Sequence, residues 1–234
     1  MCNHYRKSQK LTDEFMRFVT SKSRKVITPL LDPDFPEHTY PKSLAPVLIE
    51  TAGEQSFVSM RWGVLIPIQG KLKPVTNARD DKLTGFSWRY ATAERRCLIP
   101  ATSYFEPGTG PEGARGELLF TVKERPAFFF AGVWNPDAEG SDERGFAMVT
   151  TSPNDYVRPF HDRMPVVLTD EEADEWIGDE PLAPNRLKAL CRGLPSEALL
   201  HTVIPANPKE QRPAKLSITK KGTKATDDDQ PTLL

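Results

Sequence analysis

The chain has 234 residues and a formal net charge of -1, with 27% charged and 38% hydrophobic residues. Such a chain is long enough to bury a sizeable core, and its charge balance excludes a uniformly basic nucleic-acid coat. The longest uncharged apolar run, 127–134, is far too short to cross a membrane, and no secretory signal is expected at the N-terminus. The three cysteines lack C-x-x-C spacing, so we expect a reducing cytoplasm and no metal site.

The first part of the chain predicts one helix followed by irregular structure. Apolar residues recur at helical spacing over Lys7–Thr20, which indicates an amphipathic helix. Prolines then interrupt the chain, and we expect none of them inside a regular element. These residues are Pro29, Pro33, Pro36, Pro41 and Pro46.

Short β-type runs dominate the middle of the chain. They are Val58–Trp62, Arg96–Ile99, Leu118–Val122, Ala127–Val133, Phe146–Thr151 and Val166–Leu168. Turn residues separate them, as in an antiparallel β protein. Near the end, Thr169 and Glu172 form a capping box for one helix, and a second helix is predicted from Pro184 to Cys191. We therefore predict an α+β fold, with one domain over 1–212 around a strongly bent antiparallel sheet, and a disordered polar tail over 213–234.

Cys2 has the most unusual placement of any reactive residue in the sequence. Removal of Met1 would leave an α-amine and a thiol on adjacent carbons, with pKa values of about 7.7–8.0 and 8.5. This 1,2-aminothiol can act as an N-terminal nucleophile, or it can condense with an aldehyde to give a thiazolidine. Alternatively, Cys2 is an incidental residue of a frayed terminus.

Two further residues are candidate acids or bases. Glu106 ends a nearly continuous apolar stretch, and partial burial there would raise its pKa and suit it to proton transfer. His161 lies directly before the apolar run Val166–Leu168, where its pKa near 6.5 would suit acid–base chemistry. Each has an ordinary alternative, namely a solvated glutamate at a strand end and a hydrogen-bonded structural histidine.

Basic and aromatic residues alternate between Lys71 and Arg96. The basic ones are Lys71, Lys73, Arg79, Lys82, Arg89, Arg95 and Arg96, and the aromatic ones in or near the segment are Trp62, Phe86, Trp88 and Tyr90. This mixture suits single-stranded nucleic acid, which needs phosphate neutralisation and stacking surfaces. The alternative is a solvated charged surface over ordinary core aromatics.

The order of these signals resembles one protein family. The chain contains a second-position cysteine, W-G-V-L-I-P, N-A-R, R-R-C-L-I-P-A-x-x-x-x-E, F-A-G-V-W, T-T-S-P-N and H-D-R-M-P-V-V-L. Together they resemble the SRAP family, the SOS-response-associated peptidase domain proteins, also called abasic-site processing proteins. The resemblance implies a single domain with a curved, barrel-like antiparallel β core and flanking helices. It also implies a cytoplasmic protein, nucleoid-associated when bound to DNA, that captures abasic sites in single-stranded DNA covalently and without a cofactor.

The resemblance also assigns roles residue by residue. Cys2 is implied to form the crosslink, Asn77 to position its amine, Glu106 to shuttle protons and His161 to act as a second acid or base. The residues implied to line the DNA path are Arg79, Arg163, Thr150 and His4.

The chain departs from the family pattern at three places. Asn3 and His4 replace the usual glycine and arginine, Pro107 replaces an aromatic residue, and Ile68 with Gln69 replaces a wedging aromatic residue. The implied catalytic set is thus intact, whereas the DNA-facing set is altered. Two other functions stay open: a peptidase or amidase that uses Cys2 as its nucleophile, and a non-catalytic module that binds single-stranded DNA.

Overall fold

The computed structural model describes residues 2–7, 36–109, 115–138 and 143–205. Except for Lys7, the helix predicted over Lys7–Thr20 lies outside these residues, as does the tail predicted over 213–234. The described helices include none long and apolar enough to cross a membrane.

Five strands close into a ring at the centre of the fold. They are β3 (Leu44–Thr51), β4 (Glu54–Trp62), β8 (Arg96–Ala101), β11 (Phe128–Pro136) and β12 (Arg144–Thr151). Neighbours pair in the order β12-β4-β3-β8-β11, and β11 pairs with β12 again to complete the ring. The β12–β4 pairing is parallel, and so is that of β12 with the short strand β7 (Asn77–Arg79). The predicted barrel-like core is therefore confirmed, with two parallel pairings in a mostly antiparallel sheet.

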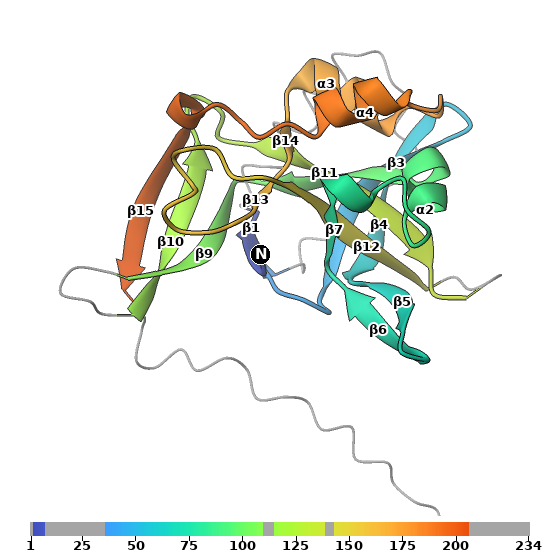
Figure 1. The fold of residues 1–234 in the computed structure, drawn as a ribbon, viewed down its shortest axis with the longest axis horizontal. Helices are drawn as coiled ribbons and strands as arrows, with labels where there is room; N and C mark the ends of the chain where they lie inside the picture. Colours follow the sequence, from blue (N-terminus) through green and yellow to red (C-terminus); the bar gives the residue numbers. More distant parts are fainter. Residues whose placement is uncertain (1, 8–35, 110–114, 139–142, 206–234) are drawn as a thin grey trace, which may run out of the picture.

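A second sheet lies beside the ring, on the left of Figure 1. Its order is β15 (Leu199–Pro205), β10 (Arg115–Val122), β9 (Ser103–Thr109), β1 (His4–Arg6) and β2 (His38–Thr39). Thr102 alone separates β8 from β9, so one stretch of chain runs from the ring into the second sheet. Two short strands, β13 (Met164–Pro165) and β14 (Val167–Leu168), pair with β12 and β11.

Helices flank this core, as predicted. They are α2 (Arg89–Glu94), α3 (Asp170–Ile177) and α4 (Pro184–Leu190), with 3-10 turns η1 (Asp80–Lys82) and η3 (Ser196–Ala198). The capping box of Thr169 and Glu172 begins α3, as expected. In Figure 1, α3 and α4 lie above the ring. The Trp176 indole N–H donates to the carbonyls of Cys97 and Gly132, which ties α3 to β8 and β11.

The prediction that prolines avoid regular elements was wrong for Pro46. It lies inside β3, opposite Ser59 of β4. The pairing of β3 with β8 on the other side is limited to Leu48 and Leu98. Proline lacks an amide proton, but Pro46 lies outside this pairing, so its missing donor does not interrupt the contact between β3 and β8.

Candidate active site

Cys2 is anchored just before β1, in the core of the protein. Its side chain is 1% exposed, and its thiol lies 3.5 Å from the carbonyl oxygen of His4. The Asn77 amide donates hydrogen bonds to the carbonyl oxygen of Cys2 at 3.2 Å and to the hydroxyl of Thr76 at 3.0 Å. Burial first, and the charge of Glu106 second, raise the pKa of the Cys2 thiol. The sulfur is therefore held as a neutral thiol, and Asn77 fixes the backbone of the same residue.

Glu106 lies in the middle of β9, not at a strand end. It is paired with Leu118 of β10 and is 1% exposed. Burial raises the pKa of this carboxyl from an ordinary value near 4.5 to about 7. At neutral pH both protonation states are consequently populated, which is what a proton-transfer group requires.

His161 lies between β12 and β13, and its ring faces Glu106. The distance from His161 Nε2 to Glu106 Oε2 is 3.9 Å. On the other side of the ring, the backbone N–H of Arg163 donates to Nδ1 at 3.0 Å. A neutral imidazole that accepts at Nδ1 carries its proton on Nε2, toward Glu106. Burial lowers the pKa of His161, which favours this neutral form.

Asp162 provides His161 with a second partner. Its carboxylate lies 2.9 Å from His161 Nδ1. This contact is favourable only when the ring is protonated and Nδ1 becomes a donor, and the charge of Asp162 raises the His161 pKa against the effect of burial. The sequence analysis missed this residue, although its place directly after His161 was visible.

Arg79 and Arg163 differ sharply in their surroundings. Arg79 is exposed and forms two hydrogen bonds of 2.9 and 3.0 Å to the Asp81 carboxylate. Arg163 is buried, where its guanidinium donates to Asp80 at 2.6 Å and to the carbonyl oxygen of Thr150 at 2.5 Å. Arg79 is accessible at the surface beside Asp81, whereas Arg163 connects η1 to β12.

Thr150 and Asn77 contribute polar atoms that the described residues leave without a hydrogen bond. The Thr150 hydroxyl and the Asn77 side-chain carbonyl oxygen are both buried and unpaired in this part of the chain. Buried polar groups in native proteins nearly always have a partner. Both atoms are therefore candidate contacts for a polar ligand.

His4 is enclosed by neighbouring side chains. Its ring stacks on Phe105 with centroids 3.8 Å apart and on Tyr40 at 4.4 Å. Its two nitrogens lie 2.7 Å from His38 Nδ1 and 3.3 Å from the Glu117 carboxylate. Burial lowers the pKa of His4. A direct contact of His4 with DNA stays a prediction, and any such contact would have to compete with these partners.

The aromatic residues of the basic segment fall into two groups. Trp62 and Trp88 are buried in the core, whereas Phe86 and Tyr90 are 85% and 58% exposed. The Arg89 guanidinium lies over both exposed rings, 5.5 Å from Phe86 and 4.8 Å from Tyr90. The two tryptophans of this basic and aromatic pattern are therefore core residues, and only Phe86 and Tyr90 form an exposed aromatic surface.

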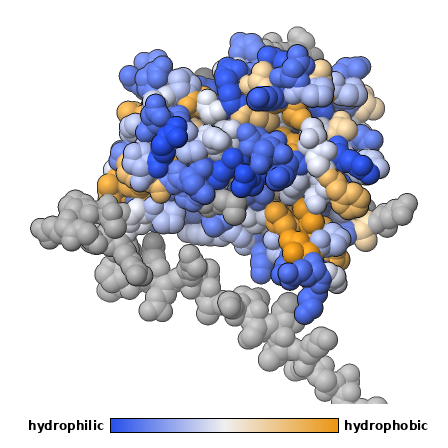
Figure 2. Space-filling view, in the orientation of Figure 1, coloured by the Kyte–Doolittle hydropathy of each residue, from blue (hydrophilic) through white to orange (hydrophobic). Residues whose placement is uncertain are grey.

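The hairpin of β5 (Val64–Ile68) and β6 (Lys71–Val75) occupies the place of the expected wedging aromatic residue. Its two turn residues, Gln69 and Gly70, have φ values of 53° and 73°, as a tight two-residue turn requires. Ile68 and Leu72 are exposed on it. Figure 2 shows the resulting apolar patch over this hairpin.

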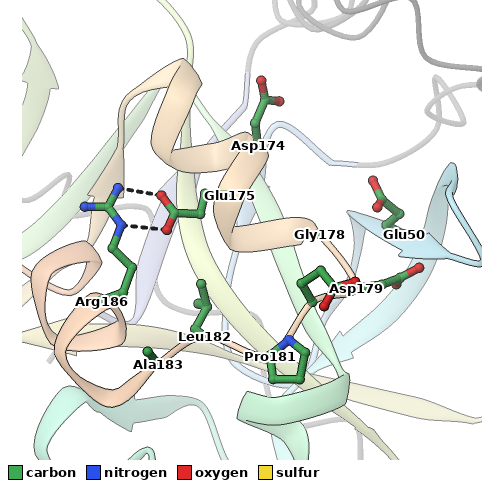
Figure 3. A pocket seen from close by; sticks show the side chains of 10 residues that line it. Glu50, Asp174, Glu175, Gly178, Asp179, Pro181, Leu182, Ala183 and Arg186 are labelled. Carbon is green, nitrogen blue, oxygen red and sulfur yellow. Dashed lines mark hydrogen bonds and ion pairs between the residues drawn. The ribbon is translucent and has the colours of Figure 1, made fainter.

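A pocket of about 600 Å³ lies beside α3 and α4 (Figure 3), and Cys2 is not among the residues that line it. Glu50, Asp174, Glu175, Asp179, Glu180 and Arg186 give it an acidic lining. Its one arginine is paired with Glu175 at 2.5 and 2.6 Å. Such a lining repels phosphate, so this pocket is not a candidate nucleic-acid site. Among the residues described, no group of three histidine, cysteine or acidic side chains could hold a metal ion.

Comparison with known proteins identifies relatives of this chain. The family profile described as SOS response associated peptidase (SRAP) matches residues 1–207. The abasic site processing protein YoqW of Bacillus subtilis is 31% identical over 62% of this chain and 67% of its own. YoaM of the same organism, also described as an abasic site processing protein, is 28% identical over 72% of this chain and 79% of its own. YedK of Escherichia coli, also called an abasic site processing protein, is 27% identical over 46% of this chain and 49% of its own.

Solved structures share the fold. A crystal structure of a protein from Bacteroides thetaiotaomicron matches with a TM-score of 0.68 and 23% identity, over 87% of this chain and 92% of that one. A protein from Bordetella bronchiseptica matches with a TM-score of 0.67 and 20% identity, over 88% of this chain and 100% of that one. At these identities the structures establish the fold alone.

Proposed function

Since this chain belongs to the SOS response associated peptidase (SRAP) family, we propose that it processes abasic sites in single-stranded DNA by capturing them covalently through Cys2. The relatives described as abasic site processing proteins support this function. The observation that carries the chemistry is the location of Glu106. A buried carboxyl with a pKa of about 7 faces His161 and acts electrostatically on the Cys2 thiol.

The capture needs Met1 to be removed, and we propose that the protein itself performs or assists this step. The free amine of Cys2 then adds to the aldehyde carbon of the open-chain sugar. Glu106 transfers protons from nitrogen to oxygen, and the oxygen leaves as water to give a Schiff base. The sulfur of Cys2 adds to the same carbon and its proton passes to nitrogen, so aminothiol and aldehyde give thiazolidine and water.

The other residues would assist in distinct ways. Asn77 holds the backbone of Cys2, and its unpaired side-chain oxygen is an acceptor for the amine. His161, with Nε2–H toward Glu106, is a second proton carrier. The thiazolidine removes the aldehyde that makes an abasic strand prone to β-elimination. A single strand is the proposed substrate because stacked bases would enclose the sugar in a duplex.

The function is tested by incubating the mature protein with a single-stranded oligonucleotide that carries one abasic site. A species that survives denaturing electrophoresis, with the mass of protein plus DNA minus one water, is expected. Cys2→Ala protein should give none. Turnover of peptides without DNA trapping would instead favour a peptidase, and salt-sensitive binding that leaves no stable species would favour a non-catalytic binding module.

Arg79 is proposed to hold a DNA phosphate by exchanging its Asp81 partner, and it offers a prediction on salt dependence. In a Cys2→Ala background, Arg79→Ala should weaken binding and reduce the slope of log affinity against log salt by about 0.7, the value for one phosphate contact on a single strand. The measurement is fluorescence anisotropy across a salt series.

Arg186→Ala is the matched control, because Arg186 is also an exposed arginine in a two-bond ion pair, here within the acidic pocket. The slope of log affinity against log salt for Arg186→Ala should equal that of the parent protein.

Arg163 was also expected to hold a phosphate, and Arg163→Ala tests this in the same series. An unchanged slope for Arg79→Ala would remove Arg79 from the proposed DNA path.

A further inference from the structure

Tyr104 occupies a fixed position on β9, two residues before Glu106. In the pairing of β1 with β9, Tyr104 lies opposite Tyr5, while His4 lies opposite Phe105. Side chains alternate along a strand, so Tyr104 shares the face of β9 that carries Glu106. Tyr104 and Cys2 belong to the same buried cluster. The ring of Tyr104 stacks on Phe120, with centroids 4.9 Å apart.

The hydroxyl of Tyr104 is buried without a hydrogen-bond partner in the described part of the chain. The side chain is 0% exposed, so the structure gives this hydroxyl no access to bulk solvent. A buried tyrosine hydroxyl normally has a partner, and an unsatisfied one calls for an explanation. The Tyr5 hydroxyl is likewise buried without a hydrogen bond in this part of the chain, and Cys2 also raises its pKa, but Thr39 rather than Glu106 is its polar neighbour.

The surroundings of this hydroxyl belong to the site. Burial raises the pKa of Tyr104 well above its ordinary value, and charges on Cys2 and Glu106 raise it further. The hydroxyl is thus within electrostatic reach of both groups, and it stays protonated at any working pH. It therefore remains a hydrogen-bond donor within the buried cluster that contains Cys2, on the strand face that carries Glu106.

We propose that Tyr104 is a catalytic hydrogen-bond donor in the capture of the abasic aldehyde. This inference rests on the proposed function and adds a residue to it. As the Cys2 nitrogen bonds to the aldehyde carbon, the electron pair of the C=O double bond moves onto oxygen. The Tyr104 hydroxyl donates a hydrogen bond to that oxygen and keeps its own proton, while Glu106 supplies the proton that forms the hydroxyl group. A prepositioned donor aimed at developing charge needs no reorganisation during the reaction.

Tyr104→Phe tests this role, because phenylalanine keeps the ring and its stacking on Phe120 and removes only the donor. The single-turnover rate of capture at saturating protein should fall by about 10²–10³, the typical effect of losing one such donor. The shape of the pH–rate profile should not change, because Tyr104 does not titrate. The melting temperature should stay equal or rise, because an unsatisfied buried hydroxyl has been removed.

Tyr5→Phe is the matched control, since it removes a buried hydroxyl from the strand position opposite Tyr104. It should capture at the wild-type rate. If wild-type protein captures and Tyr104→Phe captures equally fast, the donor role is wrong while the proposed function stands. A lower melting temperature for Tyr104→Phe would also overturn the inference, since it would reveal a folded-state partner for the hydroxyl. Failure of wild-type protein to capture would instead overturn the proposed function.

Discussion

A single extra residue in front of Cys2 should abolish covalent capture of abasic sites. The proposed thiazolidine needs both the primary amine and the thiol of Cys2, and an added residue converts that amine into an amide that cannot form a Schiff base. The comparison is between proteins released from a cleavable tag with Cys2 free or with one glycine before it. Denaturing electrophoresis and intact mass should show nearly complete crosslinking for the first protein and none for the second.

Two controls separate the roles of amine and thiol. Cys2→Ser keeps the amine and removes the sulfur, so it should give a DNA adduct only after borohydride reduction traps the Schiff base. Cys97 and Cys191 remain in every variant, and both are buried without a free amine. Crosslinking at full yield by the glycine-extended protein would show that the linkage does not use the terminal amine.

Glu106→Gln should slow capture by about 10²–10⁴, the usual effect of removing a general acid or base. Glutamine preserves the shape and hydrogen-bonding capacity but cannot carry the proton. Wild-type capture should follow a bell-shaped pH profile, because the amine must be neutral, above about pH 7.7–8.0, and Glu106 must be protonated, below about 7. The variant should keep only the limb that rises with pH. Single-turnover rates from pH 5.5 to 9 provide the measurement.

Glu106→Gln should slow capture but stabilise the folded protein at high pH. The folded-state pKa of Glu106 is raised by burial, so the native protein binds this proton more tightly than the unfolded chain does. The contribution of Glu106 to stability is therefore largest at low pH, and it is lost as pH rises from about 4.5 to about 7. Glu106→Gln should be more stable than wild type at pH 8, with a smaller difference at pH 5.

Glu117→Gln is the matched control for Glu106, because Glu117 lies on the adjacent strand β10 but is half-exposed. It should capture within a few fold of the wild-type rate. A rate for Glu106→Gln within the same range would assign Glu106 a structural role only.

Local periodicity in the sequence was sufficient to predict much of the fold. The alternation of Val58, Met60 and Trp62 corresponds to β4, and the capping box at Thr169 begins α3. These signals depend on neighbouring residues alone, which is why they were readable. β3 was missed because Pro46 argued against a strand, and only its sheet partners explain why proline is tolerated there.

Burial could not be predicted in the same way. Phe86 and Trp88 lie two residues apart in the sequence, yet one is exposed and the other is in the core. Arg96 was counted with the basic surface, but it is buried, and its guanidinium donates to backbone carbonyls of α2, α3 and Gly178. Counting charges along a segment cannot distinguish a surface arginine from a buried arginine that donates hydrogen bonds to backbone carbonyl oxygens near helix ends.

The sequence by itself determined which residues can react and the order in which they occur. It supplied the second-position cysteine, the carboxyl of Glu106 and the imidazole of His161. Only the tertiary structure decided how these groups behave, because a pKa and a hydrogen-bond partner depend on what surrounds a group in space. Asn77 reaches Cys2 across 75 positions of the chain, and Glu106 acquires a pKa of about 7 because β9 is buried between β1 and β10.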